Sequence, residues 1–253
     1  MKYKAVFVDV DGTLIPNYTD LVPSPRVSEA IAKARKKGVH VGLVTGRPMK
    51  YLENIFAHLR LEGPSVIVNG TQVIDSVTKE ILWQQALSFE DLSSSLAITK
   101  QFASRIIIND EGIDIPYTTQ TNIKLYKNPL LVYIESLPGN EADDLVASLT
   151  HMPTITATKT IGFKSGQSDV IISHVNATKQ HGLLTASEIL GISTREIIGI
   201  GDGYNDFPLM MAAGFKVAMG NAIEDLKDIA DYIAPTVDAD GVADVIEKFV
   251  LAS

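Results

Sequence analysis

Two aspartates stand two positions apart, Asp9 and Asp11, at the end of an apolar run in the segment VFVDVDGTLI. Neighbouring carboxylates repel each other, so a pair in this place is either a polar turn or part of a site that uses both groups. A carboxylate is ionised at neutral pH and needs no separate base to act as a nucleophile, as in enzymes that form an aspartyl-phosphate. With the glycine and threonine that follow, the pair indicates phosphoryl-transfer chemistry.

Such chemistry requires positive charge, because a carboxylate that attacks a phosphate dianion meets a like charge. The repulsion amounts to roughly 4 kcal/mol per pair of unit charges at ~4 Å and an effective dielectric constant of about 20. We expect Lys179, together with a divalent cation held by Asp9 and Asp202, to cancel it. Hard oxygen ligands favour Mg²⁺.

The second aspartate has a separate task in this scheme. Asp11 donates a proton to the leaving alkoxide and later accepts one from the hydrolytic water. Gly12 lets the backbone approach the phosphoryl group closely, and the Thr45 hydroxyl donates to the phosphoryl oxygens.

These residues need a scaffold that brings distant segments together, and the pattern of apolar runs supplies one. Runs rich in Val and Ile alternate with helical patterns such as SPRVSEAIAKARKKG, which predicts right-handed βαβ units and a doubly wound α/β sheet. The predicted parallel strands are AVFVDV, VHVGLVT, SVIVNG, EIIGIGD, FKVAM and DYIAP. Ligands of such sheets bind outside the carboxyl ends of the strands, where Asp9, Asp11, Thr45 and Asp202 fall, while Lys179 opens a helix.

The middle of the chain has a different pattern, in which strands outnumber helices. Its runs RIIIND, LLVYIES, TITATKT and DVIIS predict strands, and FEDLSSSLAITKQFA and GNEADDLVASLTH predict helices. We therefore expect a separate α+β domain over residues 85–175, inserted into a catalytic core formed by residues 1–84 and 176–253.

Composition excludes several classes of function. There are 22 Lys and Arg against 30 Asp and Glu, so a net charge of −8 disfavours nucleic acid and anionic membranes as partners. The absence of cysteine excludes thiol nucleophiles, thiolate metal sites and disulfides. Asp9 interrupts the first apolar run too early for a signal peptide or a membrane span, so we expect a cytoplasmic protein, either a monomer or a homodimer.

Four segments together resemble a known superfamily: DVDGT, VTGR, the lysine in NATKQHG, and GDGYNDFPLM. In this order they are similar to the motifs of the haloacid-dehalogenase-like phosphohydrolases. The segments VNGTQVID and AMGNAIEDLKDIADYIAPTVDADGVADVIEKF resemble the Cof-type branch, which implies a Rossmann-like core with a large α/β cap. One departure is Gln180, which follows the lysine where that branch usually has glycine.

The resemblance implies a role for each matching residue. Asp9 would be the nucleophile and Asp11 the acid and base, and Mg²⁺ would be held by Asp9, the Asp11 backbone carbonyl and Asp202, with Asp206 supporting these ligands. The residues expected to bind the phosphate or the rest of the substrate are Gly12, Thr45, Gly46, Arg47, Asn69, Lys179 and Asn205. Asn69 is equally well explained as a turn residue before Gly70.

The leading hypothesis is a Mg²⁺-dependent phosphatase that hydrolyses a small phosphomonoester, such as a sugar phosphate, with the insert acting as a lid. A phosphomutase acting on a sugar phosphate is the second interpretation. A phospho-accepting signalling module also combines aspartate, hydroxyl, lysine and Mg²⁺, but Asp11 and an insert of about 90 residues argue against it.

Overall fold

The computed structural model describes residues 2–16, 22–102, 105–162 and 166–252. The chain forms two compact units, one of residues Met1–Trp83 and Lys179–Ser253 and the other of Gln84–Thr178. The unit borders thus fall after residues 83 and 178, where the sequence predicted 84 and 175. We call the split unit the core and the inserted unit the cap.

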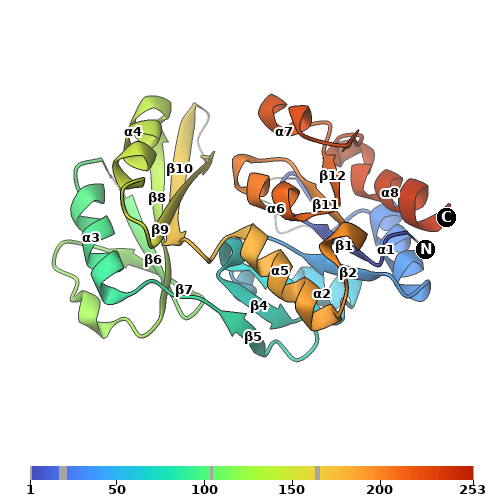
Figure 1. The fold of residues 1–253 in the computed structure, drawn as a ribbon, viewed down its shortest axis with the longest axis horizontal. Helices are drawn as coiled ribbons and strands as arrows, with labels where there is room; N and C mark the ends of the chain where they lie inside the picture. Colours follow the sequence, from blue (N-terminus) through green and yellow to red (C-terminus); the bar gives the residue numbers. More distant parts are fainter. Residues whose placement is uncertain (1, 17–21, 103–104, 163–165, 253) are drawn as a thin grey trace. The chain divides into compact units, whose positions relative to one another are not determined.

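The core is built on a five-stranded parallel sheet, as the apolar runs predicted (Figure 1). Its order is β13-β12-β11-β1-β2, with β11 in the centre and β1 between β11 and β2. The strands are β1 (Ala5–Val8), β2 (His40–Leu43), β11 (Ile197–Gly201), β12 (Phe215–Ala218) and β13 (Tyr232–Ile233). Every residue of β1 and β11 is buried, as expected for strands covered on both faces.

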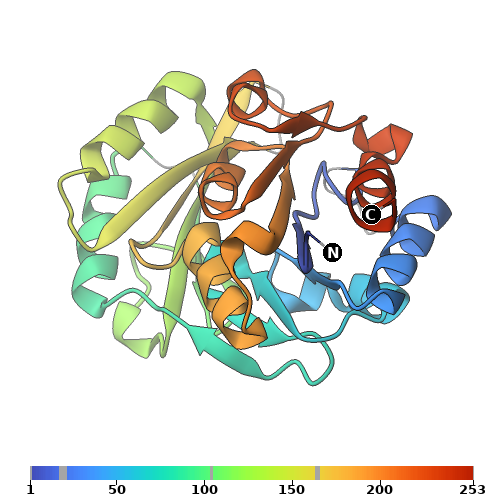
Figure 2. The ribbon, with the colours of Figure 1, turned by 45° about the vertical axis from the view of Figure 1, so that its right-hand side comes forward.

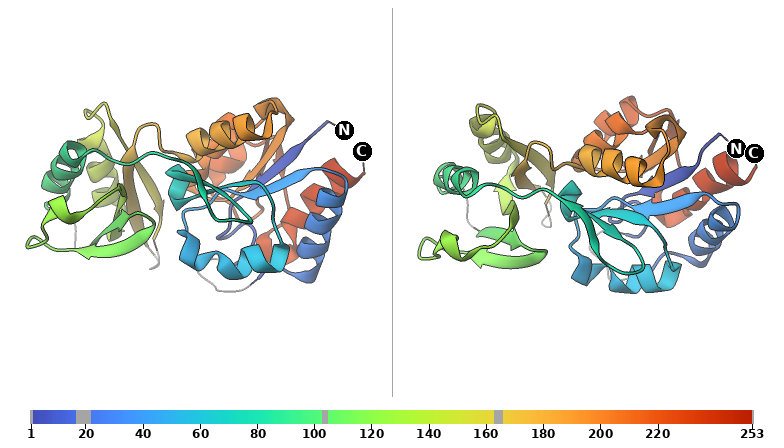
Figure 3. Two further views of the ribbon diagram at one scale, coloured as in Figure 1. Left: turned by 90° about the horizontal axis from the view of Figure 1, so that it is seen from below. Right: turned by 60° about the horizontal axis from the view of Figure 1, so that its bottom comes forward.

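Helices cover both faces of this sheet, which confirms the doubly wound α/β class (Figure 3). Helices α5 and α6 lie on one face, and α1 and α8 pack side by side on the other (Figure 2). The core helices are α1 (Pro25–Lys36), α2 (Glu53–Leu59), α5 (Lys179–Leu190), α6 (Phe207–Ala212), α7 (Glu224–Asp228) and α8 (Gly241–Ile246), with a π-helical turn at Glu247–Leu251. Short 3₁₀ turns lie at Met49–Tyr51, Val68–Gly70, Thr194–Glu196, Tyr204–Asp206 and Val237–Ala239.

The segment SVIVNG was predicted as a further parallel strand, and this was wrong in part. Its strand β3 (Pro64–Ile67) pairs antiparallel with β4 (Gln72–Asp75), which pairs with β5 (Ile81–Gln84) in a separate three-stranded sheet. Within the described residues, β3 meets the parallel sheet through one bridge between Val44 and Val66. The chain reverses at once because Val68, Asn69 and Gly70 all have positive φ angles, so β3 continues into a hairpin instead of a crossover.

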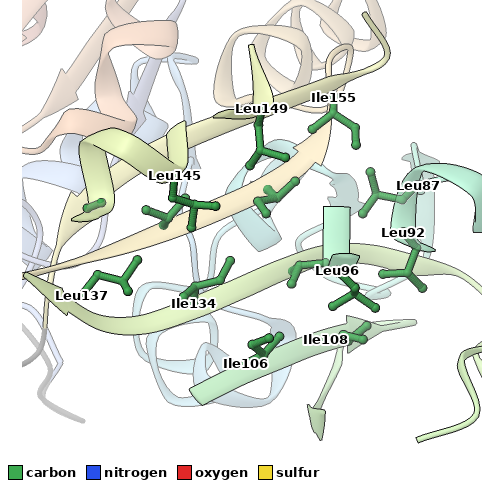
Figure 4. Close-up of a cluster of buried hydrophobic side chains, with 14 of the residues drawn as sticks. Leu87, Leu92, Leu96, Ile106, Ile108, Ile134, Leu137, Leu145, Leu149 and Ile155 are labelled. Carbon is green, nitrogen blue, oxygen red and sulfur yellow. The ribbon is translucent and has the colours of Figure 1, made fainter. Parts of the chain in front are cut away.

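The described residues of the cap form an antiparallel sheet of order β7-β6-β8-β10-β9 and two α-helices. Its elements are α3 (Phe89–Thr99), β6 (Arg105–Asp110), β7 (Ile113–Tyr117), a 3₁₀ turn at Ile123–Leu125, β8 (Pro129–Pro138), α4 (Gly139–Leu149), β9 (Ile155–Ile161) and β10 (Gln167–His174). Figure 4 shows its core, where Leu92, Leu96, Leu145 and Leu149 of the helices pack on the sheet. Strand β7 was not predicted, because its sequence IDIPY is short and contains a proline.

Candidate active site

The residues singled out by the sequence gather at the carboxyl ends of three neighbouring strands. Asp9 directly follows β1, and its backbone N–H donates to the Ile200 carbonyl at 2.9 Å, so the parallel pairing continues to the aspartate. Asp202 directly follows β11, and Thr45 lies two residues beyond β2. All three side chains are buried. Parallel pairing thus brings together groups that are up to 193 positions apart in the sequence.

Lys179 is the buried cation at the centre of the site. It is the first residue of α5, and its Nζ donates to Asp9 Oδ1 at 2.7 Å and to Asp206 Oδ1 at 2.6 Å. Burial lowers the pKa of Lys179, but the charges of Asp206 and Asp9 outweigh burial and raise it above its ordinary value. The lysine therefore remains cationic and fixes the carboxylate of Asp9.

Three buried carboxylates surround this one lysine. Ligand oxygens of Asp9, Asp202 and Asp206 all lie within 4.8 Å of one another. Burial, the strongest influence, raises the pKa of Asp9 well above its usual value, although Lys179 opposes it. Burial and the charge of Asp206 raise the pKa of Asp202 to about 7. A cluster with this surplus of buried negative charge, made of hard oxygen donors, fits a divalent cation such as Mg²⁺.

Asp206 holds the other groups in place. Its Oδ1 accepts from Lys179, and its Oδ2 accepts the backbone N–H groups of Asp202 and Gly203 at 2.9 and 3.0 Å. The absence of a side chain at Gly201 makes room for it, because a Cβ there would lie 2.6 Å from the Asp206 Cβ. With both oxygens engaged, Asp206 orients the lysine and the turn that carries Asp202.

Two residues that the sequence analysis gave no role also contact the site. The Thr13 hydroxyl donates to Asp202 Oδ1 at 3.0 Å and thereby links the first loop to the end of β11. Asn221 Nδ2 donates to the Gly12 carbonyl at 2.8 Å, and its Oδ1 accepts from the Val237 backbone at 2.9 Å. Thr13 lies within the segment DVDGT and Asn221 within the segment AMGNAIEDL, so the position of each in a family-like segment was a usable signal.

Arg47 contacts Asp11 and was expected to bind phosphate. Its Nε and Nη2 donate to the two Asp11 oxygens at 2.8 and 2.6 Å, and its Nη1 donates to the Tyr51 carbonyl at 3.3 Å. The Asp11 side chain is 25% exposed, whereas the Asp9 side chain is 8% exposed. The two aspartates thus differ in environment: one is buried against lysine, and the other is held by a guanidinium nearer to solvent.

Thr45, Gly46, Asn69 and Asn205 form the remaining side of the site. Asn205 Nδ2 donates to Asn69 Oδ1 at 3.2 Å, and the Asn69 backbone N–H donates to the Thr45 carbonyl at 2.9 Å. The Thr45 hydroxyl accepts the Arg47 backbone N–H at 3.1 Å. A Cβ built on Gly46 would meet no atom of the described chain within 4 Å, so the backbone there is open to a ligand.

Asn69 has a left-handed backbone, with φ 55°, after Val68 with φ 49°. Asparagine is one of the residues other than glycine that adopt positive φ most readily, whereas a β-branched residue such as valine is strained there. Asn69 is therefore both a turn residue and a residue of the site, because the turn places its side chain against Asn205.

Comparison with known proteins agrees with this geometry. A family profile described as haloacid dehalogenase-like hydrolase matches residues 6–129 and 118–246. The phosphoglycolate phosphatase of Methanopyrus kandleri is 28% identical over 97% of this chain and 96% of its own. The 5-amino-6-(5-phospho-D-ribitylamino)uracil phosphatase YcsE of Bacillus subtilis is 26% identical over 98% of this chain and 96% of its own.

A solved structure of a haloacid dehalogenase-like hydrolase from Bacteroides thetaiotaomicron superposes with a TM-score of 0.76, at 26% identity, over 97% of this chain and 99% of its own. No helix among the described residues is long and apolar enough to cross a bilayer.

Proposed function

This chain belongs to the haloacid dehalogenase-like hydrolases, in their Cof-type branch, and from that premise we propose that it is a Mg²⁺-dependent phosphatase that uses Asp9 as its nucleophile. The substrate class is a small phosphomonoester, such as a sugar phosphate or a similar metabolite. The two curated relatives named above are phosphatases of different small phosphorylated compounds. Because both relatives are phosphatases, they support the reaction. Because their substrates differ, they do not indicate which alcohol is released from the phosphate in this protein.

The observation that carries the proposal is the contact of Lys179 with Asp9 inside the buried acidic cluster. Lys179 fixes Asp9 Oδ1, which leaves Oδ2 as the oxygen that attacks phosphorus. A bond forms between Asp9 Oδ2 and phosphorus while the ester bond to phosphorus breaks, and the electron pair of that ester bond leaves with the alkoxide. Asp11 protonates the alkoxide once Arg47 has released one of its oxygens, with the proton that Asp11 took from water in the preceding hydrolysis.

Hydrolysis of the phosphoenzyme reverses the roles of the same groups. Asp11 removes a proton from water, the water oxygen bonds to phosphorus, and the bond from phosphorus to Asp9 breaks to restore the carboxylate. Lys179 and the Thr45 hydroxyl donate to the phosphoryl oxygens during both steps.

The residues that would hold Mg²⁺ are Asp9 and Asp202, with the Asp11 backbone carbonyl as a third ligand. When bound, the cation neutralises the charge of the carboxylates and of the phosphoryl group. Thr13 fixes the orientation of Asp202, and Asp206 fixes the turn that carries it. Lys179 fixes the carboxylate of Asp9, so both ligand side chains are in position before a metal binds.

The test is a panel of phosphomonoesters, assayed for phosphate release with Mg²⁺ and with EDTA. We expect release that requires Mg²⁺ and that is lost in Asp9→Asn, while Asp225→Asn, an exposed aspartate on α7, retains wild-type activity. Unchanged turnover in Asp9→Asn would refute the assignment of the nucleophile. Conversion of a sugar phosphate into its isomer without phosphate release would indicate a phosphomutase instead.

A further inference from the structure

We propose that Gly182 is a positioning residue that sets the distance between the two phosphate-binding side chains, Lys179 and Thr45. The inference rests on the proposed function, because it assumes that both side chains bind phosphate. Gly182 lies one turn after Lys179 on α5 and is buried. The turn therefore carries the buried lysine and the buried glycine on the same side of the helix.

The contact that Gly182 makes is with Val66 of β3. A Cβ built on Gly182 would overlap Val66 Cγ1 and would lie 3.2 Å from Val66 Cγ2. Helix and strand thus approach each other more closely than any residue with a side chain would allow. Because Val66 is itself fully buried in the core, it has no room to move aside.

Val66 also connects directly to the opposite side of the site. Its carbonyl accepts the Thr45 backbone N–H at 3.0 Å, and Val66 bridges to Val44, the residue before Thr45. Two residues farther on, the Val68 N–H donates to the Arg47 carbonyl at 3.1 Å. The loop that carries Thr45 is thus fixed to β3. The contact of Val66 with Gly182 therefore sets the distance between that loop and the helix that carries Lys179.

A methyl group at residue 182 would force α5 away from β3 by about 1 Å, because carbon atoms in contact prefer separations of roughly 3.5–4.0 Å. The two hydrogen bonds of Lys179, at 2.7 and 2.6 Å, cannot both survive such a shift without rearrangement. A misplacement of about 1 Å can reduce a catalytic rate roughly 10²-fold. We therefore expect weakened phosphate binding together with slower turnover.

The test is a double-mutant cycle with the variants Gly182→Ala, Val66→Ala and their combination. The measurements are the dissociation constant of orthophosphate, obtained by calorimetry with Mg²⁺, and kcat and KM for a phosphomonoester that the wild type hydrolyses. We expect Gly182→Ala to weaken orthophosphate binding roughly tenfold and to lower kcat/KM by roughly 10². Adding Val66→Ala, which removes the opposing methyl groups, restores both values to within about threefold of the wild type.

Ala186→Gly is the matched control, because Ala186 is a fully buried residue one turn farther along α5. It exchanges the same two residue types in the opposite direction and weakens the helix without pushing it off the strand. We expect it to lower stability in urea while keeping orthophosphate affinity. If Ala186→Gly loses as much affinity as Gly182→Ala, the effect is general destabilisation and the inference is wrong.

The remaining outcomes separate this inference from the proposed function. Unchanged orthophosphate affinity in Gly182→Ala, or no recovery in the double variant, overturns the role of Gly182 alone. A wild type that neither binds orthophosphate nor hydrolyses any ester refutes the proposed function. Should Gly182→Ala fail to fold, Val66→Ile adds a methyl group from the other side: weaker orthophosphate binding then supports the inference, and unchanged binding overturns it.

Discussion

Replacement of Asp202 by asparagine should make the metal-free protein more stable. Burial and the charge of Asp206 raise the pKa of Asp202 from 3.8 to about 7. The folded protein therefore holds a proton that the unfolded chain has lost between these two pH values, so folding stability falls as the pH rises from about 4 to about 7. Above pH 7 the loss is complete.

The size of this effect follows from the two pKa values. A difference of about 3 pKa units corresponds to roughly 4 kcal/mol, at about 1.4 kcal/mol per unit. Asparagine carries no charge and keeps an oxygen that can accept from Thr13, so Asp202→Asn should recover up to about 4 kcal/mol at pH 8. Near pH 4, where Asp202 is neutral in the folded wild type, the variant should have no advantage.

The assay is urea unfolding of both proteins in EDTA at pH 8 and at pH 4.5, repeated at pH 8 with Mg²⁺. Magnesium at 100 times its dissociation constant should stabilise the wild type by about 2.7 kcal/mol and leave the variant almost unchanged. The reasoning is refuted if Asp202→Asn is less stable than the wild type in EDTA at pH 8. It is also refuted if the gain is as large at pH 4.5 as at pH 8.

Three further predictions concern other charged groups. Lys179→Met should lower the free energy of unfolding in EDTA by about 3–5 kcal/mol, because it leaves buried carboxylates without their cation. A decrease below about 1 kcal/mol, measured by urea unfolding, would contradict this. Burial lowers the pKa of His40 from 6.5 to about 4, so the free energy of unfolding should fall by about 3 kcal/mol as the pH is lowered from 6.5 to 4. An equal decrease of the free energy of unfolding in His40→Gln would contradict this. Arg47→Lys removes the two-pronged contact with Asp11 and should lower kcat roughly tenfold with little change in KM, whereas a raised KM alone would indicate that Arg47 binds the substrate phosphate.

The parallel sheet could be predicted because strands that are covered on both faces appear in the sequence as continuous apolar runs. Asp9, Thr45 and Asp202 could be placed for the same reason, since each follows one of these runs. The antiparallel direction of β3 could not be predicted from its apolar residues, because it depends on the backbone angles of Val68 and Asn69.

Contacts between distant side chains were also beyond the sequence. The motif VTGR suggested that Arg47 binds phosphate, but only the folded chain shows its guanidinium bonded to both oxygens of Asp11. Gly182 carried no signal at all, because the need for glycine arises from the close approach of Val66, 116 positions earlier in the chain.

The most direct test of the account is to identify the phosphorylated residue. Wild-type protein is mixed with a radiolabelled phosphomonoester that it hydrolyses, quenched in acid during the first turnover, digested and mapped by mass spectrometry. The account predicts a label on the peptide that contains Asp9, at Asp9 itself, sensitive to hydroxylamine and absent from Asp9→Asn. A label on any other residue, or first-turnover phosphate release from Asp9→Asn at the wild-type rate, would contradict it.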